Sequence, residues 1–283
     1  MQKRVMTIQD ISCQGRCSLT VALPILSACG IETAILPTAV LSTHTGGFTG
    51  FTFRDLTDDI TPISDHWKTL DRHYDAIYTG FMGSAHQIDL VQQMFRDFKD
   101  QGTVIMVDPA MADNGVLYKT YTKEMVEGTI GLAKMSDIVI PNQTEAAYLL
   151  GEEYKGDVKT PEEAEALMKK LAALGPKYVV VTGISFEEGK LGAGSYDSTT
   201  GKISYAFQDR APGYFHGTGD VFASAFLGAY LQAKPGEDPL AKGVQVAVDY
   251  TCDCIHRTIA EKQDIKYGVA FEMEVPKLLE YIK

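Results

Sequence analysis

Residues 103–142 read TVIMVDPAMADNGVLYKTYTKEMVEGTIGLAKMSDIVIPN, and this stretch decides the fold class. It begins and ends with a short apolar run, 103–107 and 137–140, and neither run alternates with polar residues. Unbroken apolar runs of this length are typical of strands that are covered on both faces. Residues 123–135, between them, are predicted to be helical. A strand, a helix and a second strand predict a crossover connection between parallel strands.

The same alternation extends from this stretch to both ends of the chain. Further strands are predicted at 4–9, 32–36, 76–79 and 178–182, with a hairpin of 192–196 and 202–207. Further helices are predicted at 18–29, 84–99, 160–174, 220–232, 238–262 (as one helix or two) and from about 275 to 283. The sequence therefore predicts an α/β fold in which helices cover both faces of a central, mostly parallel sheet.

No linker, repeat or abrupt change of composition divides the chain, so residues 1–283 are predicted to form a single domain. The stretches 42–55 and 111–124 are candidate flaps over bound ligands, with ordinary surface loops as the alternative reading. Ligands of such sheets bind at the carboxyl ends of the strands. The residues that follow each strand are therefore the ones to search for function.

The overall composition narrows the classes of partner. Of 283 residues, 26 are Lys or Arg and 37 are Asp or Glu, so the formal net charge is −11. This balance argues against binding of duplex nucleic acid or docking on an anionic membrane, because both need clustered basic side chains. No apolar stretch has the length of a membrane span, and residues 1–10 lack the pattern of a signal peptide. Five cysteines, an odd number, favour reduced thiols and a cytoplasmic location.

The strongest functional signal is Gly217-Thr218-Gly219-Asp220, directly before the apolar run VFASAFLGAYL. Glycines let the backbone turn tightly and approach a ligand, and the free amides at the start of a helix favour an anion. A carboxylate beside such an anion hole is suited to accept a proton from a hydroxyl that attacks phosphorus. The alternative reading is a glycine turn followed by an ordinary acidic residue in the first helical turn.

Polar residues also follow three of the predicted strands. Asn142 and Glu145, three residues apart at a helix start, share one face and would suit a hydrated Mg²⁺, or they could simply cap the helix. Asp108 could hold Mg²⁺ or its waters, with a loop turn as the alternative. Thr182 and Gly183 could meet a phosphate, or merely end their strand. Together these groups predict phosphoryl transfer at one edge of the sheet, without a P-loop or a GxGxxG motif.

These motifs resemble those of the ribokinase-like superfamily and, within it, of the pyridoxal kinases, over nearly the whole chain. GTGD at 217–220 looks like the superfamily's anion hole and catalytic base, and PNQTEA at 141–146 looks like its Asn-x-x-Glu magnesium motif. DPAMADNG at 108–115 is similar to its Asp-Pro-Val-(Met/Leu)-Gly-Asp stretch, with Ala110 and Ala112 in place of Val and Gly. The resemblance implies a three-layer α/β/α sandwich around a mostly parallel sheet.

The segments on the substrate side indicate the branch. Residues 42–46, STHTG, look like the Ser-Asn-His-Thr-Gly loop that lies over the vitamin ring in pyridoxal kinases. Phe81 stands where these kinases carry a tyrosine, and Asp10 stands where they carry the serine that contacts the pyridine ring. The substrate-binding residues implied by the resemblance are Asp10, His44, Thr45, Gly46 and Phe81.

The resemblance implies ATP-dependent phosphorylation of the 5′-hydroxymethyl group of pyridoxal, pyridoxine or pyridoxamine, in vitamin B6 salvage. Asp220 would be the catalytic base, and the amides of Gly217, Thr218 and Gly219 would form the anion hole. The implied ATP-binding residues are Asp108, Asn142, Thr182, Gly183, Gly217 and Thr218, and those implied for Mg²⁺ are Asp108, Asn142 and Glu145. A homodimer and stimulation by a monovalent cation such as K⁺ are also implied.

Other readings stay open at this point. Hydroxymethylpyrimidine kinases of thiamine synthesis resemble this chain, but they usually carry Cys at the position of Asp220. Sugar and nucleoside kinases of the superfamily usually carry an early Gly-Gly pair, which is absent from this sequence. A non-catalytic homologue that only holds a vitamer or a nucleotide is a third reading, although Asp220, Asn142 and Glu145 are all present.

Overall fold

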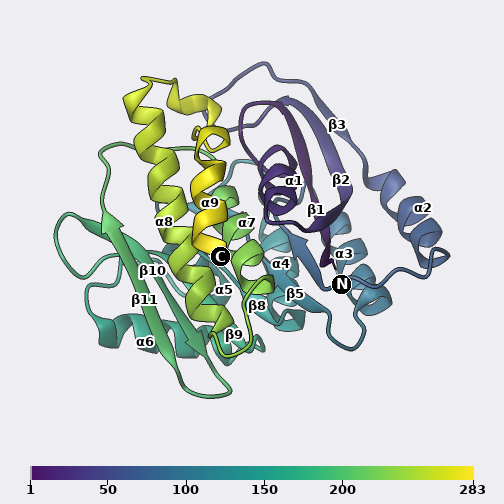
Figure 1. Ribbon diagram of the computed structural model, residues 1–283. Coiled ribbons are helices and arrows are strands. Elements are labelled where there is room, and N and C mark those ends of the chain that lie inside the picture. Colours follow the sequence, from purple (N-terminus) through teal and green to yellow (C-terminus); the bar gives the residue numbers. More distant parts are fainter. Residues whose placement is uncertain (1) are drawn as a thin grey trace.

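The computed structural model describes residues 2–283 and is built around a nine-stranded sheet of order β11-β10-β9-β8-β5-β4-β1-β2-β3 (Figure 1). The strands of this sheet are β1 Arg4–Gln14, β2 Glu32–Thr43, β3 Phe53–Asp55, β4 Ala76–Thr79, β5 Val104–Val107, β8 Ile138–Val139, β9 Tyr178–Ile184, β10 Lys190–Asp197 and β11 Ile203–Asp209. A separate two-stranded hairpin consists of β6 Ala112–Asp113 and β7 Val116–Leu117.

The strands from β2 to β9 in this order are parallel, whereas β3, β10 and β11 at the two edges run antiparallel to their neighbours. Parallel neighbours need crossover connections, and helices provide most of them. The helices are α1 Leu19–Ala28, α2 Thr57–Lys68, α3 Ala85–Phe98, α4 Lys123–Met135, α5 Gln143–Leu150, α6 Pro161–Ala172, α7 Thr218–Leu231, α8 Pro239–Ala260 and α9 Val275–Ile282, with 3₁₀ turns Ile265–Tyr267 and Glu272–Glu274.

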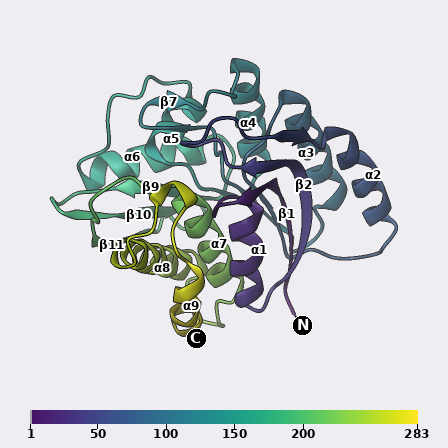
Figure 2. The same ribbon diagram turned by 90° about the horizontal axis from the view of Figure 1, so that it is seen from above.

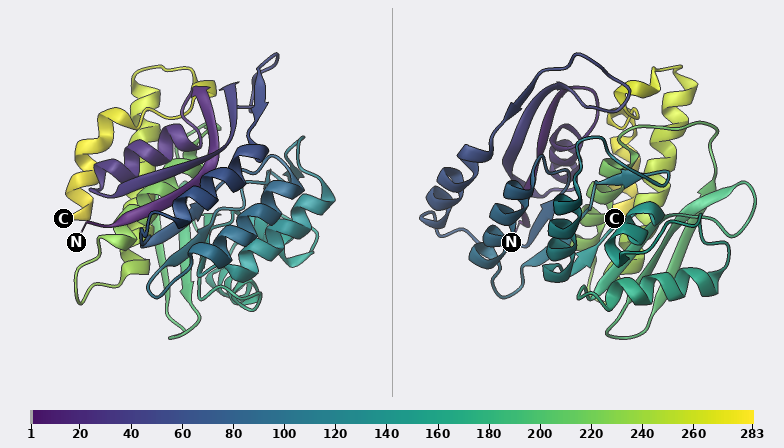
Figure 3. Two further views of the ribbon diagram at one scale, coloured as in Figure 1. Left: turned by 90° about the vertical axis from the view of Figure 1, so that its right-hand side faces the viewer. Right: turned by 180° about the vertical axis from the view of Figure 1, so that it is seen from behind.

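The helices form two layers, one on each face of the sheet. Figures 2 and 3 show α1, α7, α8 and α9 on one face and α2 to α6 on the other. Alternate residues of the strands feed the two cores that result: Val5 packs with the first layer, whereas Met6 and Ile8 pack with the second. Since side chains point to opposite faces in turn, strands that are covered on both faces must be apolar throughout. The predicted three-layer α/β/α arrangement is confirmed.

The predicted strands and helices are present, and most ends differ by a few residues. The exceptions are β1, which continues to Gln14 beyond its predicted end at 9, and β2, which continues through Pro37 to Thr43 beyond its predicted end at 36. The stretch 238–262 forms one long helix, α8. The sequence reading missed α2, whose residues TDDITPISDHWK include an internal proline and bury only Ile60 and Ser64. It also missed β3 and the β6–β7 hairpin, which are too short to show a hydrophobic period. Among residues 2–283, no helix is long and apolar enough to cross a membrane.

Candidate active site

The start of α7 is shaped by a glycine that no other residue could replace without strain. Gly217 has φ 72°, and a Cβ at this position would lie 2.0 Å from the carbonyl oxygen of Arg16. The left-handed conformation and the close approach of a second backbone both favour glycine. Behind this turn α7 is almost wholly apolar, with its residues from Val221 to Ala229 buried. The fold therefore fixes a helix start whose first amides have no partner within the helix.

Asp220 lies in the first turn of α7, with its side chain still partly exposed. The pKa of Asp220 is raised to about 7: burial of the carboxyl within the surrounding protein is the largest cause, the backbone amide of Ser18 opposes the shift, and the negative charge of Asp10 adds to it. A carboxyl with this pKa is divided between its two forms near neutral pH. It can therefore accept a proton more readily than an ordinary aspartate.

Asp10 lies in β1 and is only 4% exposed. Its two carboxylate oxygens accept hydrogen bonds from the hydroxyls of Ser12, at 3.0 Å, and Ser18, at 2.6 Å. Burial raises the pKa of Asp10, although these hydroxyls oppose the shift. Ser18 and Cys17 were missed from the sequence. The Cys17 sulfur lies 3.5 Å from the position that a Cβ on Gly217 would take.

Asn142 and Glu145 form a reciprocal capping box at the start of α5. The side-chain oxygen of Asn142 accepts from the amide of Glu145, and the Glu145 carboxylate accepts from the amide of Asn142, both at 2.9 Å. Glu145 also accepts from the amide of Met111 at 2.9 Å, and the Asn142 side chain donates to the Ala112 carbonyl at 2.8 Å. The pair therefore does cap the helix, and it also fastens the segment that follows Asp108.

Negative charge accumulates around this capping box. Burial raises the pKa of Glu145 to about 7, and the carboxylate of Asp113 in β6 adds to that shift. Burial and the charges of Glu145 and Asp220 hold the pKa of Asp108 well above its usual range. A nearby cation would relieve this repulsion.

The donor set fits a hydrated Mg²⁺ better than a directly caged metal. In the part of the chain that the structure describes, no group of three or more His, Cys, Asp or Glu side chains is arranged to hold a metal ion. The oxygens of Glu145 and Asn142 already accept backbone amides. Mg²⁺ keeps several of its waters and takes few protein ligands, so carboxylates and an amide that act through water suit it.

Thr182 and Gly183 lie inside β9, which continues to Ile184, and do not end it. Thr182 pairs with Asn142 in an isolated parallel bridge. Gly183 has φ 78°, and its carbonyl accepts from the side chain of Gln143 at 2.6 Å. The structure therefore places the predicted phosphate-contacting residues beside the capping box of α5.

His44 is 8% exposed, and both of its ring nitrogens have backbone partners. Nδ1 accepts from the amide of Gly46 at 3.2 Å, so Nε2 carries the proton that is donated to the carbonyl of Lys266 at 2.6 Å. Since both nitrogens are engaged, a ligand could contact His44 only through the face or the carbon atoms of its ring. Thr45 is exposed, and Phe81 is half-buried with its ring 6.3 Å from that of Tyr121.

Two groups of predicted residues thus meet near the middle of the sheet, where only β4 separates β1 from β5. Asp10, His44 and Asp220 come from β1, the loop after β2 and α7, whereas Asp108, Asn142 and Glu145 come from β5 and α5. The charges of Asp108 and Asp220 both raise the pKa of Tyr78, so the two carboxylates lie near the same buried hydroxyl. Asp113 belongs to the acidic group as well. The sequence did not predict this, because Asp113 does not follow a strand with a recognisable hydrophobic pattern.

Comparison with known proteins agrees with this arrangement. The family model described as phosphomethylpyrimidine kinase matches residues 25–268. The pyridoxal kinase of Arabidopsis thaliana is 27% identical over 277 residues, which cover 93% of this chain and 85% of that protein. The crystal structure of pyridoxal kinase from Lactobacillus plantarum is similar with a TM-score of 0.88 and 28% identity, covering 99% of this chain and 98% of the other.

A second similar structure contains a vitamer. It is a Bacteroides thetaiotaomicron protein, provisionally named a phosphomethylpyrimidine kinase and crystallised with pyridoxal. The similarity has a TM-score of 0.91 and 36% identity, and it covers 98% of this chain and 96% of the other. Because the family model covers most of the sequence and the sheet has the expected layers, the chain belongs to the phosphomethylpyrimidine kinase family and has a ribokinase-like fold.

Proposed function

We propose that this protein is an ATP-dependent kinase that phosphorylates the 5′-hydroxymethyl group of vitamin B6 vitamers: pyridoxal, pyridoxine or pyridoxamine. The observation that carries the proposal is Asp220, held at a glycine-led helix start with a pKa raised to about 7. The names of the relatives from Arabidopsis and Lactobacillus, and the pyridoxal in the Bacteroides structure, support the choice of substrate.

In the proposed reaction, the oxygen of the 5′-hydroxyl forms a bond to the γ-phosphorus of ATP, and Asp220 accepts the proton of that hydroxyl. The bond between that phosphorus and the β,γ-bridging oxygen breaks, and ADP leaves. The amides of Gly217, Thr218, Gly219 and Asp220 stabilise the charge on the transferred group. In a loose transition state the proton moves late, so the position of the carboxylate matters more than its strength as a base.

The nucleotide side of the proposed site consists of Asp108, Asn142, Thr182 and Gly183. Mg²⁺, when bound, neutralises charge on the ATP phosphates. Asp108, Asn142 and Glu145 would hold it through waters. The capping box keeps the segment 108–112 in place beside it. A monovalent cation and a homodimer are further parts of this proposal.

On the vitamer side, Asp10, Thr45, Gly46 and Phe81 would surround the pyridine ring, together with the ring of His44. The unpaired cysteines 13, 17, 29, 252 and 254 support a cytoplasmic protein as part of the same proposal.

A second candidate is hydroxymethylpyrimidine kinase, because the family model carries the phosphomethylpyrimidine kinase description. Its substrate also presents a hydroxymethyl group on a nitrogen heterocycle, so the same base and anion hole could act on it. Asp220 favours the vitamer kinase over this candidate, because cysteine is usual at that position in the pyrimidine kinases that the sequence resembles.

The test is ADP release from Mg-ATP, measured with each of the three vitamers and with hydroxymethylpyrimidine. We expect turnover with at least one vitamer, and a loss of kcat of roughly 10²- to 10⁴-fold in Asp220→Asn with little change in vitamer affinity. Turnover of the pyrimidine alone would reject the vitamer proposal in favour of the second candidate. Tight vitamer binding without turnover would show a binding protein, and undiminished kcat in Asp220→Asn would remove Asp220 as the base.

A further inference from the structure

The segment 213–217, GYFHG, leads directly into the anion hole and contacts the loops on both sides of it. On one side the hydroxyl of Tyr214 donates to Oδ2 of Asp113 at 2.6 Å. The other oxygen of Asp113 accepts the amide of Asn114 at 2.8 Å. The carboxylate of the β6–β7 hairpin is therefore held from two directions, and one of them is the segment before the anion hole.

The donor in this contact keeps its proton. Burial and the neighbouring Asp113 carboxylate raise the pKa of Tyr214 above its usual range. The side chain is nevertheless 50% exposed, so no tightly packed core fixes its place. Two contacts define the position of the Tyr214 side chain: its hydrogen bond to Asp113 and its ring contact with His216.

On the other side, His216 is wedged against the loop 44–50. Its ring centroid lies 5.2 Å from that of Tyr214, edge to face, and 5.2 Å from that of His44. A Cβ on Gly46 would lie 2.8 Å from two atoms of the His216 ring. Only a residue without a side chain leaves room for this contact.

The loop 44–50 is fastened on its far side as well. His44 donates to the carbonyl of Lys266, and the ring of Phe48 lies 5.2 Å from that of Tyr267. A continuous series of contacts thus runs from residues 266–267 through this loop to His216, Tyr214 and finally Asp113. These contacts give a direct route by which a displacement at either end would move the segment that begins the anion hole.

We propose that Tyr214 and His216 are positioning residues that couple the vitamer-side loop 44–50 to the nucleotide-side hairpin β6–β7. The inference rests on the proposed function, which places His44, Thr45 and Gly46 beside the vitamer and the segment 108–112, where the hairpin β6–β7 begins, beside Mg-ATP. When one substrate binds, it stabilises the arrangement of residues 213–217 to which the second substrate binds more tightly. Coupling of this kind is reciprocal, so pyridoxal must strengthen nucleotide binding by the same factor by which the nucleotide strengthens pyridoxal binding.

The test measures the dissociation constant of Mg-ADP by calorimetry, with and without saturating pyridoxal, in wild type and in Tyr214→Phe. Wild type should bind Mg-ADP several-fold more tightly when pyridoxal is present. Tyr214→Phe keeps the ring but removes the hydrogen bond to Asp113. We expect it to weaken Mg-ADP alone by roughly 3- to 10-fold, to bring the coupling factor close to one, and to leave the affinity for pyridoxal alone unchanged.

Two further variants separate positioning from general damage to the fold. Tyr205→Phe is the matched control, because it also removes a tyrosine hydroxyl that donates a hydrogen bond. The acceptor of that bond is the carbonyl of Pro161, outside the site, so this variant should keep the wild-type coupling factor. Gly46→Ala should abolish coupling by pushing the His216 ring aside. In a His216→Ala background the same glycine substitution should not change the coupling factor further, because the ring that it displaces is gone.

The outcomes distinguish this inference from the proposed function. Wild-type turnover of a vitamer with a coupling factor of one, or a wild-type coupling factor in both Tyr214→Phe and Gly46→Ala, would overturn the inference and leave the function standing. If wild type neither binds nor phosphorylates a vitamer, the proposed function fails and the coupling proposal fails with it. Unchanged Mg-ADP affinity in Tyr214→Phe would independently remove the role of the Tyr214–Asp113 contact.

Discussion

Burial raises the pKa of both Asp220 and Glu145, but the two carboxyl groups have different hydrogen-bond partners and therefore different roles. Glu145 accepts amides from Asn142 and Met111, and these bonds hold two segments together. For Asp220 the counteracting contact is the amide of Ser18. An acid that is buried without strong compensation destabilises the protein, and such groups are characteristic of active sites. At the scale of the residue, Asp220 therefore combines a proposed catalytic role with a structural cost.

This cost can be measured with Asp220→Asn in the absence of ligands. The pKa of Asp220 is raised from 3.8 to about 7, so the stability that its protonated form contributes is present in full below pH 3.8 and is lost as the pH rises from there through 7. We expect the Asn variant to be more stable than wild type by about 1–2 kcal/mol at pH 8, which is less than the full shift implies because the side chain keeps contact with water.

The measurement is calorimetric unfolding at pH 8 and pH 6. The increase in Tm, about 2–4 °C at pH 8, should shrink at pH 6, where wild type is largely protonated. A difference in Tm between the Asn variant and wild type that is the same at pH 6 and at pH 8 would show that Asp220 is not a strained acid.

At the scale of the element, the start of α7 contains two glycines with different reasons to be there. Gly217 has a positive φ and touches the backbone of Arg16, so it is required by the fold. A Cβ on Gly219 would have no heavy atom within 4 Å, so the fold itself does not require a glycine at that position. The open space beside Gly219 is where the proposed site needs room for a phosphate.

Alanine substitution at these two positions should separate folding from function. Gly217→Ala should lower the free energy of unfolding by about 2 kcal/mol or more, because of strain and the clash with Arg16. Gly219→Ala should unfold at or above the wild-type denaturant concentration, since alanine favours a helix, but kcat should fall at least about 10-fold. Full activity in a well-folded Gly219→Ala would contradict the proposed anion hole.

The capping patterns of α5 and α6 show how far an element can be predicted. Thr160 accepts the amide of Glu163 at 3.2 Å, as its pattern predicts. The sequence Thr160-Pro161-Glu162-Glu163 fits a capping box, in which Glu163 would accept the amide of Thr160. The Glu163 carboxylate instead accepts the amide of Lys159, one residue before the cap, so the box at α6 is incomplete. In α5 the reciprocal box is complete. The sequence pattern identifies both helix starts, but it does not determine from which backbone amide each glutamate accepts a hydrogen bond.

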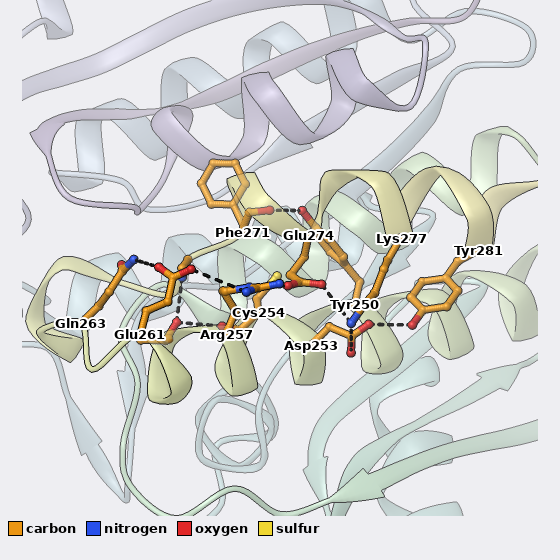
Figure 4. Close-up of polar contacts among 12 residues, drawn as sticks. Tyr250, Asp253, Cys254, Arg257, Glu261, Gln263, Phe271, Glu274, Lys277 and Tyr281 are labelled. Carbon is orange, nitrogen blue, oxygen red and sulfur yellow. Dashed lines mark hydrogen bonds and ion pairs between the residues drawn. The ribbon is translucent and has the colours of Figure 1, made fainter.

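At the scale of the whole molecule, the last part of the chain supports the vitamer side of the site. Between α8 and α9 the backbone reaches the first strand's loop, where the Arg16 amide donates to the carbonyl of Tyr267 at 2.8 Å. Figure 4 shows how α8 and the C-terminal segment are joined. Glu274, only 3% exposed, pairs with Arg257 at 2.7 Å and with Lys277 at 3.0 Å.

Glu274→Gln should loosen this junction. Burial alone would raise the pKa of Glu274, but Lys277 and Arg257 outweigh it and lower the pKa below 4.5. The stabilisation is therefore present above pH 4.5 and is lost as the pH falls. We expect a loss of about 1–2 kcal/mol at pH 7, since both basic partners are partly exposed, and a smaller difference from wild type at pH 4.

Glu261→Gln is the matched control for this urea-unfolding experiment, because Glu261 is a more exposed and more distant partner of Arg257, at 3.7 Å. Its effect should stay within about 0.5 kcal/mol. Equal losses in the two variants would show that burial of Glu274 is unimportant.

The sequence by itself determined the alternation of strands and helices, the parallel sheet and the GTGD helix start, because these depend on hydrophobic period and on local backbone requirements. It also singled out Asp220, Asp108 and Asn142 from their places at strand ends and helix starts. The net charge of −11 did not conflict with an ATP site, since helix amides and Mg²⁺ can hold phosphate in place of basic side chains.

Only the tertiary structure decided which residues surround these groups. The contacts of Tyr214 with Asp113, and of His216 with the loop 44–50, join segments about 100 and 170 residues apart, which no periodic pattern connects. The raised pKa of Asp220 likewise depends on burial by distant segments and on the charge of Asp10. Local patterns record the requirements of single elements, whereas burial and long-range contacts exist only once the elements have packed together.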